Sequence, residues 1–347
     1  MSMNRRTFLR GVAAVGGAAG LTALTAACAP GTAPSAKPGQ APSKPERAFK
    51  LAYLTLGWAG MEVIHQLGLL EQRGWKIEWQ AVDQISALVN AFSSGQVDLI
   101  DMATVIGAQM YEQGVKMSVF GVCVGALGAV LAGKGAAVRS LPELKGRKVA
   151  GIPGSSTTQE ISAHIRRAHG FDLFTEAQFV QGSTPPDVAN LLTKGEVEAA
   201  LTWEPTTTLL TQSGAGTIVT TQQQLWEQTF GAGETEVHVM YAARPAIAQE
   251  FPELLGDVNA AQAQVAELWK QRDAKAIDAM VKVTKMPEEV VREALSRTTP
   301  ISGLSDQAIE TMLRQLRFNR EHGTILKSDV WTQDPATPRR EMFVQVG

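Results

Sequence analysis

The sequence predicts an α/β protein built as two similarly wound lobes, and three observations support this fold class. From residue 49 onward, short strand-like runs alternate with stretches of helical periodicity, which is typical of α/β proteins. One strand–helix pattern occurs twice, about a hundred residues apart. The length of 347 residues suits about two domains, so each copy of the pattern can form one mostly parallel sheet flanked by helices.

The first half of the chain supplies three predicted strands and two predicted helices. Strands are expected at residues 50–56, 75–81 and 97–102. In the second of these, Trp75, Ile77 and Trp79 alternate with polar residues, as in a half-buried strand. A helix is expected at residues 60–73, because Gly74 follows in the position that favours glycine. Apolar residues at helical spacing predict a second helix at residues 85–92.

The second half continues the alternation and then becomes mostly helical. The apolar run at residues 119–127 holds Cys123, which we interpret as a buried strand thiol. A strand at residues 236–243 is expected to carry the chain back to the first lobe. The other expected strands lie at residues 148–152, 177–180, 198–203 and 217–220, and the helices at residues 245–269, 287–295 and 305–321.

The repeated pattern defines the expected lobes. Residues 91–98 read Ala-Phe-Ser-Ser-Gly-Gln-Val-Asp, and residues 191–198 read Leu-Leu-Thr-Lys-Gly-Glu-Val-Glu. Each copy holds a helix end, a closing glycine and a strand start. We expect lobe I to comprise residues 49–138 and 236–347, and lobe II to comprise residues 139–235.

The N-terminus reads as an export signal followed by a tether. Residues 1–27 hold a twin-arginine-like head and a Gly/Ala-rich apolar stretch that is too weakly apolar for a good spanning helix. An ordinary secretory signal is the alternative. Cys28 ends a lipobox-like segment and is the expected lipidation site, although Thr25 stands where leucine is preferred, so simple cleavage is also possible.

Residues 28–48 are Pro-rich and suit a tether that holds a domain off a membrane, in the periplasm or at the outer face of the cytoplasmic membrane.

Charge and cysteine content exclude several classes of protein. The net charge is −2, and without the first 27 residues it is −5, from 29 basic and 34 acidic side chains. A mildly acidic body does not suit nucleic acid binding. Two cysteines rule out a disulfide-stapled scaffold. No metal or cofactor motif is found: His164 and His169 are five residues apart and are expected at the surface, and His238 lacks a motif partner.

The candidate site lies in four loops that follow predicted strands, at residues 56–60, 102–106, 153–158 and 202–205. Ligands in open α/β sheets bind beyond the carboxyl ends of the strands. In the third loop, Ser155, Ser156 and Thr157 lead directly into a helix, where free N–H groups and hydroxyls suit an anionic or strongly polar group. The alternative is that one of these hydroxyls only caps its helix.

The other loops offer single candidates. Trp203 is expected to wall a ligand pocket, with Glu204 beside it as an acceptor; the alternative is a core tryptophan with a solvated glutamate. Trp58, next to Gly57, could lie flat against a ligand, or it could belong to the core. Thr104 corresponds to Glu204 in the repeat and is the weakest candidate.

The sequence resembles solute-binding proteins of ABC importers, of the nitrate/sulfonate/taurine and thiamine-pyrimidine-precursor type. The resemblance is carried by the segments at residues 67–75, 95–99, 141–150, 200–205 and 251–254; the fourth reads Ala-Leu-Thr-Trp-Glu-Pro. It implies a two-lobed periplasmic-binding-protein-like fold of type II with a double hinge, closing on a small solute and docking as a monomer on a membrane permease. No cofactor is implied.

The resemblance also implies that both lobes contact the solute. The expected ligand-binding residues are Gly57, Trp58, Thr104, Ser155, Ser156, Thr157, Trp203 and Glu204. None of the four loops contains Lys or Arg, so an anion would be held by neutral donors. Nitrate or a sulfonate fits the Ser/Thr helix start, and a flat nitrogen-bearing ring fits the tryptophans equally well. We favour an organic solute over a bare inorganic anion.

The sequence leaves two further functions open, an enzyme and a ligand-sensing adaptor. Relatives that make the thiamine pyrimidine are enzymes with a cysteine-rich, iron-associated segment, and here Cys123 is the only cysteine after position 28, which counts against that activity. A ligand-sensing adaptor at the membrane surface is the third possibility.

Overall fold

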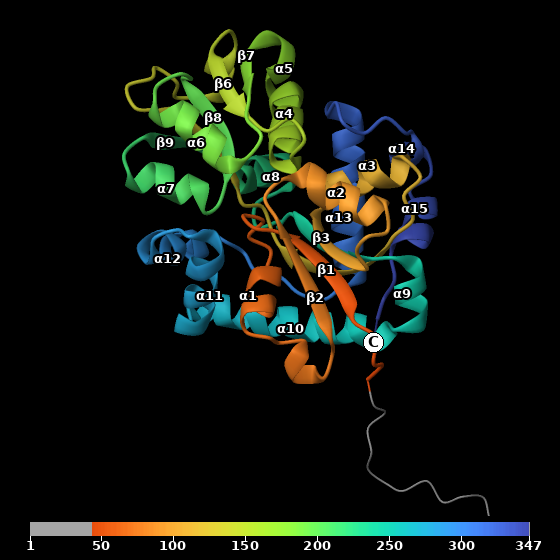
Figure 1. The fold of residues 1–347 in the computed structure, drawn as a ribbon. Coiled ribbons are helices and arrows are strands. Elements are labelled where there is room, and N and C mark those ends of the chain that lie inside the picture. Colours follow the sequence, from red (N-terminus) through yellow and green to blue (C-terminus); the bar gives the residue numbers. More distant parts are fainter. Residues whose placement is uncertain (1–43, 347) are drawn as a thin grey trace, which may run out of the picture. The chain divides into compact units, whose positions relative to one another are not determined.

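The computed structural model describes residues 44–346, which form two five-stranded mixed sheets flanked by helices (Figure 1). The strand order is β2-β1-β3-β10-β4 in the first sheet and β7-β6-β8-β5-β9 in the second. The strands of the first sheet are β1 (Phe49–Leu54), β2 (Ile77–Val82), β3 (Leu99–Ala103), β4 (Ser118–Val124) and β10 (Val239–Ala243). Those of the second are β5 (Gly128–Gly133), β6 (Lys148–Gly151), β7 (Gln178–Gln181), β8 (Ala199–Trp203) and β9 (Gly216–Thr221).

The two sheets have the same winding, which confirms the α/β fold expected from the repeated sequence pattern. In the first sheet β1 pairs in parallel with β2 and β3, and β10 runs antiparallel between β3 and β4. In the second sheet β6 pairs in parallel with β7 and β8, and β5 runs antiparallel between β8 and β9. Each antiparallel strand comes from the chain that has just left the other lobe, so two crossing segments join the lobes.

The helices of lobe I surround the first sheet. Along β1, Leu51 and Tyr53 face one apolar cluster, while Ala52 faces the other, as the period of two in a strand requires. The helices are α1 (Met61–Gln66), α2 (Ile85–Ser93), α3 (Thr104–Glu112), α9 (Pro245–Glu250), α10 (Pro252–Gln271), α11 (Ala274–Thr284), α12 (Glu288–Ser296), α13 (Asp306–His322), α14 (Val330–Gln333) and α15 (Ala336–Met342), with a 3₁₀ turn at Glu71–Arg73.

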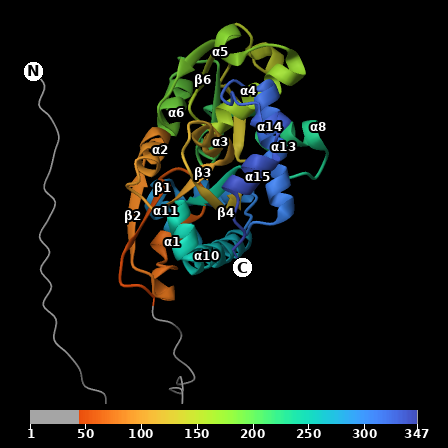
Figure 2. The ribbon, with the colours of Figure 1, turned by 90° about the vertical axis from the view of Figure 1, so that its right-hand side faces the viewer.

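Lobe II carries five helices around the second sheet: α4 (Ser156–His169), α5 (Leu173–Glu176), α6 (Pro185–Thr193), α7 (Thr206–Gln212) and α8 (Gln222–Phe230), with a 3₁₀ turn at Leu141–Leu144. Three helix pairs of the described chain join the lobes: α13 and α3 both lie beside α4, and α12 lies beside α7. Figure 2 shows the first of these pairs, with α13 reaching the end of lobe II where α4 lies.

The sheet pairing moves the first lobe boundary. The expected boundary at residues 138/139 is too late, because β5 (Gly128–Gly133) already belongs to the second sheet. The apolar run at residues 119–127 forms most of β4, and the chain crosses to the other lobe at residues 125–127. It returns at residues 231–238. We therefore propose residues 49–124 and 239–346 as lobe I and residues 128–230 as lobe II.

Two predicted helices are each divided in the structure. The helix expected at residues 60–73 ends after α1, and a separate 3₁₀ turn follows; Gly68 between them has φ 61°. The helix expected at residues 245–269 consists of α9 and α10, separated at Phe251. Pro252 follows directly, and a residue before proline is disfavoured in the helical region.

The end of the expected tether contacts the body of lobe I. Lys44 forms an ion pair with Asp257 at 2.9 Å, and its ammonium lies 4.1 Å from the centre of the Trp75 ring. The export signal, Cys28 and the rest of the tether lie outside the described residues. Among residues 44–346, none of the helices has the length and apolar character needed to span a membrane.

Candidate functional site

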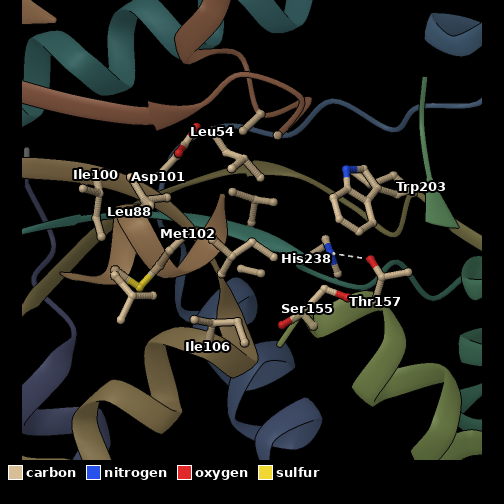
Figure 3. A pocket seen from close by; sticks show the side chains of 18 residues that line it. Leu54, Leu88, Ile100, Asp101, Met102, Ile106, Ser155, Thr157, Trp203 and His238 are labelled. Atoms are coloured by element: carbon tan, nitrogen blue, oxygen red, sulfur yellow. Dashed lines mark hydrogen bonds between the residues drawn. The ribbon is translucent and has the colours of Figure 1, made fainter. Parts of the chain in front are cut away.

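A pocket lies between the two lobes, at the carboxyl ends of β1, β3, β6 and β8 (Figure 3). All four predicted loops contribute to it, and so do both crossing segments, through Leu127 and His238. The enclosed volume is about 60 Å³, and the space between protein atoms with the open mouth included is about 600 Å³. An apolar-lined pocket between two lobes is a common place for a small-molecule site.

Lobe I supplies an apolar wall, which the sequence analysis did not assign to the site. The side chains come from β1, α2, β3 and α3, and Figure 3 shows Leu88, Met102 and Ile106 grouped on this side. The lobe I lining holds one acidic residue, Asp101, and the apolar residues Leu54, Ala59, Ile85, Leu88, Val89, Ile100, Met102, Ala103, Ile106 and Val239. Such a wall stabilises hydrocarbon or an aromatic face and offers no partner to an ion.

Lobe II supplies the polar end, at the start of α4. Ser155 is the helix cap: its Oγ accepts from the Thr158 N–H at 3.2 Å and donates to the Ile152 carbonyl at 2.9 Å. Ser155 is therefore the hydroxyl residue that caps its helix, which was the alternative to ligand binding. It leaves Ser156 and Thr157 available to a ligand.

Ser156 gives the pocket a buried hydroxyl group that has no hydrogen-bond partner in the described chain. Its side chain is 2% exposed, and its Oγ has no hydrogen-bond partner within residues 44–346. The N–H groups of Ser156 and Thr157 are in the first turn, where a helix offers no internal acceptor, and no loop atom of the described chain accepts from them. An anion placed here would meet a hydroxyl, two N–H groups and the positive end of a 14-residue helix.

Trp203 ends β8 and lines the pocket, as the sequence predicts. Its Nε1–H donates to the carbonyl of Leu56 at 2.8 Å, so a residue of lobe II bonds to the loop after β1 in lobe I. Gly57 also lines the pocket, in a tight turn in which its N–H donates to the Leu54 carbonyl at 2.8 Å. A Cβ on Gly57 would lie 2.9 Å from that carbonyl oxygen, so only glycine fits without a shift.

Trp58 does not line the pocket, contrary to expectation. It is fully buried, its Nε1–H donates to Thr298 Oγ1 at 2.7 Å, and its ring lies 5.9 Å from that of Trp269. Its φ of 57° is unusual for a bulky residue. The carboxylate of Glu62 holds this conformation, accepting from the N–H groups of Trp58 and Gly60 at 2.8 and 2.9 Å.

Thr104 and Glu204 also lie outside the pocket lining. Thr104 donates to the Val237 carbonyl at 2.8 Å, which ties α3 to the second crossing segment. Glu204 is 3% exposed and accepts from the Thr208 N–H at 3.1 Å, so it organises the start of α7. Burial raises the pKa of Glu204 to about 7, against the opposing effect of its hydrogen bonds to Thr208. Both side chains have structural partners that account for their burial.

His238, which the sequence analysis left without a partner, lines the pocket from the second crossing segment (Figure 3). Its Nδ1 lies 2.9 Å from Glu236 Oε1 and 3.2 Å from Glu160 Oε2, and its Nε2 lies 3.4 Å from Thr157 Oγ1. Burial lowers the pKa of His238, but Glu160 and then Glu236 outweigh it and raise the pKa to about 10. No local motif signals this cluster, because Glu160 is distant in the sequence.

Glu160, Glu236 and His238 are spaced closely enough to share a metal ion, since one ligand atom of each lies within 4.8 Å of the others. The amide of Gln222 argues against that use. Its Nε2 donates to both carboxylates, while its Oε1 accepts from the Gly128 N–H at 3.2 Å, which fixes the orientation of the amide. A donor group therefore faces the cluster, and the arrangement is that of a hydrogen-bonded ion cluster.

The expectation that His164 lies at the surface is wrong. His164 is 4% exposed, and its Nδ1 lies 2.9 Å from Thr229 Oγ1 between α4 and α8. Burial lowers its pKa to about 4. It lies away from the pocket lining and is a core histidine with a polar partner.

The fold and the site define a class of protein: two lobes joined by two crossing segments, with a solute-sized pocket between them. Residues 68–278 match the profile of the family described as the phosphonate periplasmic substrate-binding protein of ABC transporters. The chain belongs to this family. It is a periplasmic solute-binding component of an ABC transporter.

Solved structures agree with this fold. The periplasmic aliphatic sulphonate-binding protein SsuA from Escherichia coli superposes with a TM-score of 0.67 at 21% identity, covering 80% of this chain and 88% of that one. The alkanesulfonate-binding protein SsuA from Xanthomonas axonopodis pv. citri, bound to MOPS, gives 0.67 at 19% identity, with coverages of 80% and 95%. The nitrate-binding protein NrtA from Synechocystis PCC 6803 gives 0.64 at 14% identity, with coverages of 85% and 86%. No curated protein sequence matches this chain.

Proposed function

We propose that this protein captures a small organic anion, a sulfonate or phosphonate with an apolar body, and delivers it to a membrane permease. The observation that carries the proposal is the two-sided pocket: an apolar wall in lobe I faces the open start of α4 in lobe II. The structural neighbours from Escherichia coli and Xanthomonas, which are named for aliphatic sulphonates and alkanesulfonates, support the same class of solute.

The acidic head of the solute would lie at the start of α4. Ser156 Oγ and the N–H groups of Ser156 and Thr157 offer three donors that have no acceptor in the described chain. Hydrogen bonds to an ionised acceptor are about twice as strong as neutral ones, and the helix terminus adds to them. The tetrahedral oxygens of a sulfonate or phosphonate can use several of these donors at once.

The body of the solute would contact the apolar wall, and this argues against a bare inorganic anion. Nitrate bound at the start of α4 would make no use of Leu88, Val89 and Ile106, because it has no apolar body to bury against them. A methylene group buried there contributes about 0.8 kcal/mol, or about fourfold in affinity. The pocket thus favours an organic solute.

The structure supports a flat nitrogen-bearing ring as the solute less well than the sequence does. That interpretation used Trp58 and Trp203 as two walls, and Trp58 lies in the core beside Trp269. Glu204, its expected acceptor, is engaged at the start of α7. Only Trp203 remains in the pocket to stack on a ring.

Capture would proceed by closure of the two lobes about the crossing segments at residues 125–127 and 231–238. A solute that contacts both lobes stabilises the closed form. The hydrogen bond between Trp203 Nε1 and the Leu56 carbonyl bridges the lobes beside the pocket and would form on closure. The closed monomer would then dock on the permease, with no chemical change to the solute.

Export by the twin-arginine route and lipidation at Cys28 remain part of the proposal. They rest on the sequence of the first 28 residues alone. In the native host, Cys28→Ser should release the protein from the membrane fraction, whereas the wild-type chain should stay bound. A wild-type chain found only in the soluble fraction would remove the anchor.

Calorimetric titration of the mature protein with hexane-1-sulfonate, methanesulfonate, hexylphosphonate, nitrate and a pyrimidine tests the proposed solute. We expect hexane-1-sulfonate to bind at least about a hundredfold more tightly than nitrate, from the buried methylenes. The affinity should rise from methanesulfonate to hexane-1-sulfonate. Tightest binding by nitrate or by the uncharged pyrimidine would overturn the proposal.

A further inference from the structure

We propose that His238 supplies the positive charge that receives the acidic head of the solute, through its Nε2–H, while Glu160 and Glu236 hold its other side. This inference rests on the proposed function, because it requires an anionic solute. From the sequence, only neutral donors were expected to hold an anion; His238 would add a charged one.

His238 lies where it can contact an anion bound at the start of α4. Among the residues described as lining the pocket, it has the only basic side chain. It precedes β10 in the second crossing segment, and Figure 3 shows its ring between the apolar wall and the start of α4. Thr157, whose N–H is one of the free donors of α4, lies 3.4 Å from its Nε2. The imidazole and the helix start can therefore contact the same anion.

The two ring nitrogens have different roles. Nδ1 lies 2.9 Å from a carboxyl oxygen of Glu236, 3.2 Å from one of Glu160 and 3.1 Å from the amide nitrogen of Gln222. Two of these three neighbours are acceptors, so we assign a hydrogen to Nδ1. In a neutral ring Nε2 would then be an acceptor and would repel an anion. In the imidazolium Nε2 is a second donor, and its only neighbour is the hydroxyl at 3.4 Å, a contact that a solute oxygen can replace.

The surroundings of the ring favour the imidazolium. Glu160 comes from α4 and Glu236 from the crossing segment itself, while α8 and α13 contribute the uncharged amides of Gln222 and Gln315. Both amides donate to the carboxyl oxygens of Glu160 and Glu236. Glu160 and Glu236 together raise the pKa of His238 to about 10, although burial acts to lower it.

Asp101 is the acidic residue of the pocket lining. Burial, and secondly the nearby Glu62, raises the pKa of Asp101 well above its ordinary value, which favours the neutral form of this carboxyl group beside an anion. Glu236 is itself held partly protonated, because burial and then Glu160 raise its pKa to about 8. The cluster is therefore close to electrically balanced, with its positive end on the pocket side.

The first test compares a charged probe with a neutral one of the same shape. Titration of the mature protein with hexane-1-sulfonate and hexane-1-sulfonamide should show at least about a tenfold preference for the sulfonate, as expected for a charge-assisted contact. His238→Gln should remove most of that preference, because it should weaken binding of the sulfonate far more than binding of the sulfonamide. An unchanged preference in this variant would overturn the inference.

The second test uses a pH profile, which a merely structural role would not produce. Wild-type affinity for hexane-1-sulfonate should be flat from pH 6 to 8. In Glu160→Gln the pKa of His238 should fall toward neutrality, so affinity should decline as the pH rises through this range. Glu196→Gln, an exposed substitution in the same lobe, is the matched control and should behave as wild type. A flat profile in Glu160→Gln would contradict the inference.

NMR of the ligand-free wild-type protein separates this inference from the proposed function. We expect the His238 ring to carry two protons at pH 8. A neutral ring in a protein that still binds hexane-1-sulfonate would overturn the His238 contact alone. An imidazolium in a protein that binds neither sulfonate nor phosphonate would overturn the proposed function and, with it, the solute contact. Elemental analysis that found a bound metal, lost in His238→Gln, would also contradict it.

Discussion

The loops after β1 and after β6 occupy equivalent places in the two lobes, but their backbone N–H groups differ. Those after β1 donate to a side chain of the same loop, whereas two of those after β6 have no acceptor in the described chain. After β1, the side chain of Glu62 turns back and accepts from Trp58 and Gly60. After β6, Ser155 caps one N–H of α4, and the N–H groups of Ser156 and Thr157 have no acceptor in the described chain. One loop carries its own carboxylate, whereas the other keeps free donors that the proposed sulfonate or phosphonate would use.

The contrast explains why the pocket is two-sided. Glu62 satisfies the N–H groups of the loop after β1 internally, and α2 and α3 of the same lobe present Leu88, Val89 and Ile106 to the pocket. Lobe II keeps its donors open. A protein with this division of roles can bind a head group and a body at the same time, and each lobe gains only when the other is in place.

The largest expected effect comes from giving the open loop an anion of its own. Ser156→Asp places a carboxylate at the start of α4, where helices tolerate acidic residues, so the fold should remain. We expect at least about a hundredfold loss of affinity for hexane-1-sulfonate, from like-charge repulsion in a buried site. Calorimetry would measure it, with Ser156→Ala as the control, which should cost only about tenfold. Equal losses in the two variants would show that the charge does not matter.

Removing the internal carboxylate should affect stability more than binding. Glu62→Ala leaves the N–H groups of Trp58 and Gly60 buried without an acceptor, which costs about 1–3 kcal/mol per group. Chemical denaturation would measure the loss, and Glu62→Gln, which keeps an acceptor oxygen, should recover part of it. A Glu62→Ala variant as stable as the wild type would mean that the loop does not depend on this carboxylate.

A smaller effect is expected on the pH dependence of folding. Burial raises the pKa of Glu62 and Glu204 to about 7, and burial with Glu160 raises that of Glu236 to about 8, from an ordinary value of 4.5. The folded chain therefore binds protons that the unfolded chain has released, and stability falls as the pH rises from about 4.5 to 8. His164, with a pKa lowered to about 4, acts in the opposite direction only below pH 6.5.

Calorimetric scans should accordingly show a Tm that is a few degrees higher at pH 6 than at pH 8.5. His238 contributes in the same direction, since its raised pKa makes its stabilisation disappear as the pH approaches 10. A Tm that rises across this interval would contradict the raised pKa values of these buried carboxyl groups.

The sequence allowed the fold to be predicted because strand alternation and the recurrence at residues 91–98 and 191–198 are local signals. The lobe boundary was missed because β4 and β5 are both apolar throughout, and hydropathy does not show which sheet a buried strand joins. The loops of the site were predicted for a topological reason, since ligands bind at the carboxyl ends of parallel strands.

The individual side chains were harder to predict. Trp58 points into the core because Glu62 holds its backbone at a positive φ, and nothing in the loop sequence signals that pairing. His238 acquires its role from Glu160 and from Gln222 and Gln315 on other helices, which only the folded chain brings together. The apolar wall has the same helical spacing as an ordinary core face, so its exposure to a pocket could not be recognised.

A crystal structure of the mature protein with hexane-1-sulfonate tests the two-sided pocket most directly. We expect the sulfonate oxygens within hydrogen-bond distance of Ser156 Oγ, the free N–H groups of α4 and His238 Nε2, with the alkyl chain against Leu88, Val89 and Ile106. A sulfonate bound at the loop after β1, or an alkyl chain directed toward α4, would contradict the division of roles between the lobes.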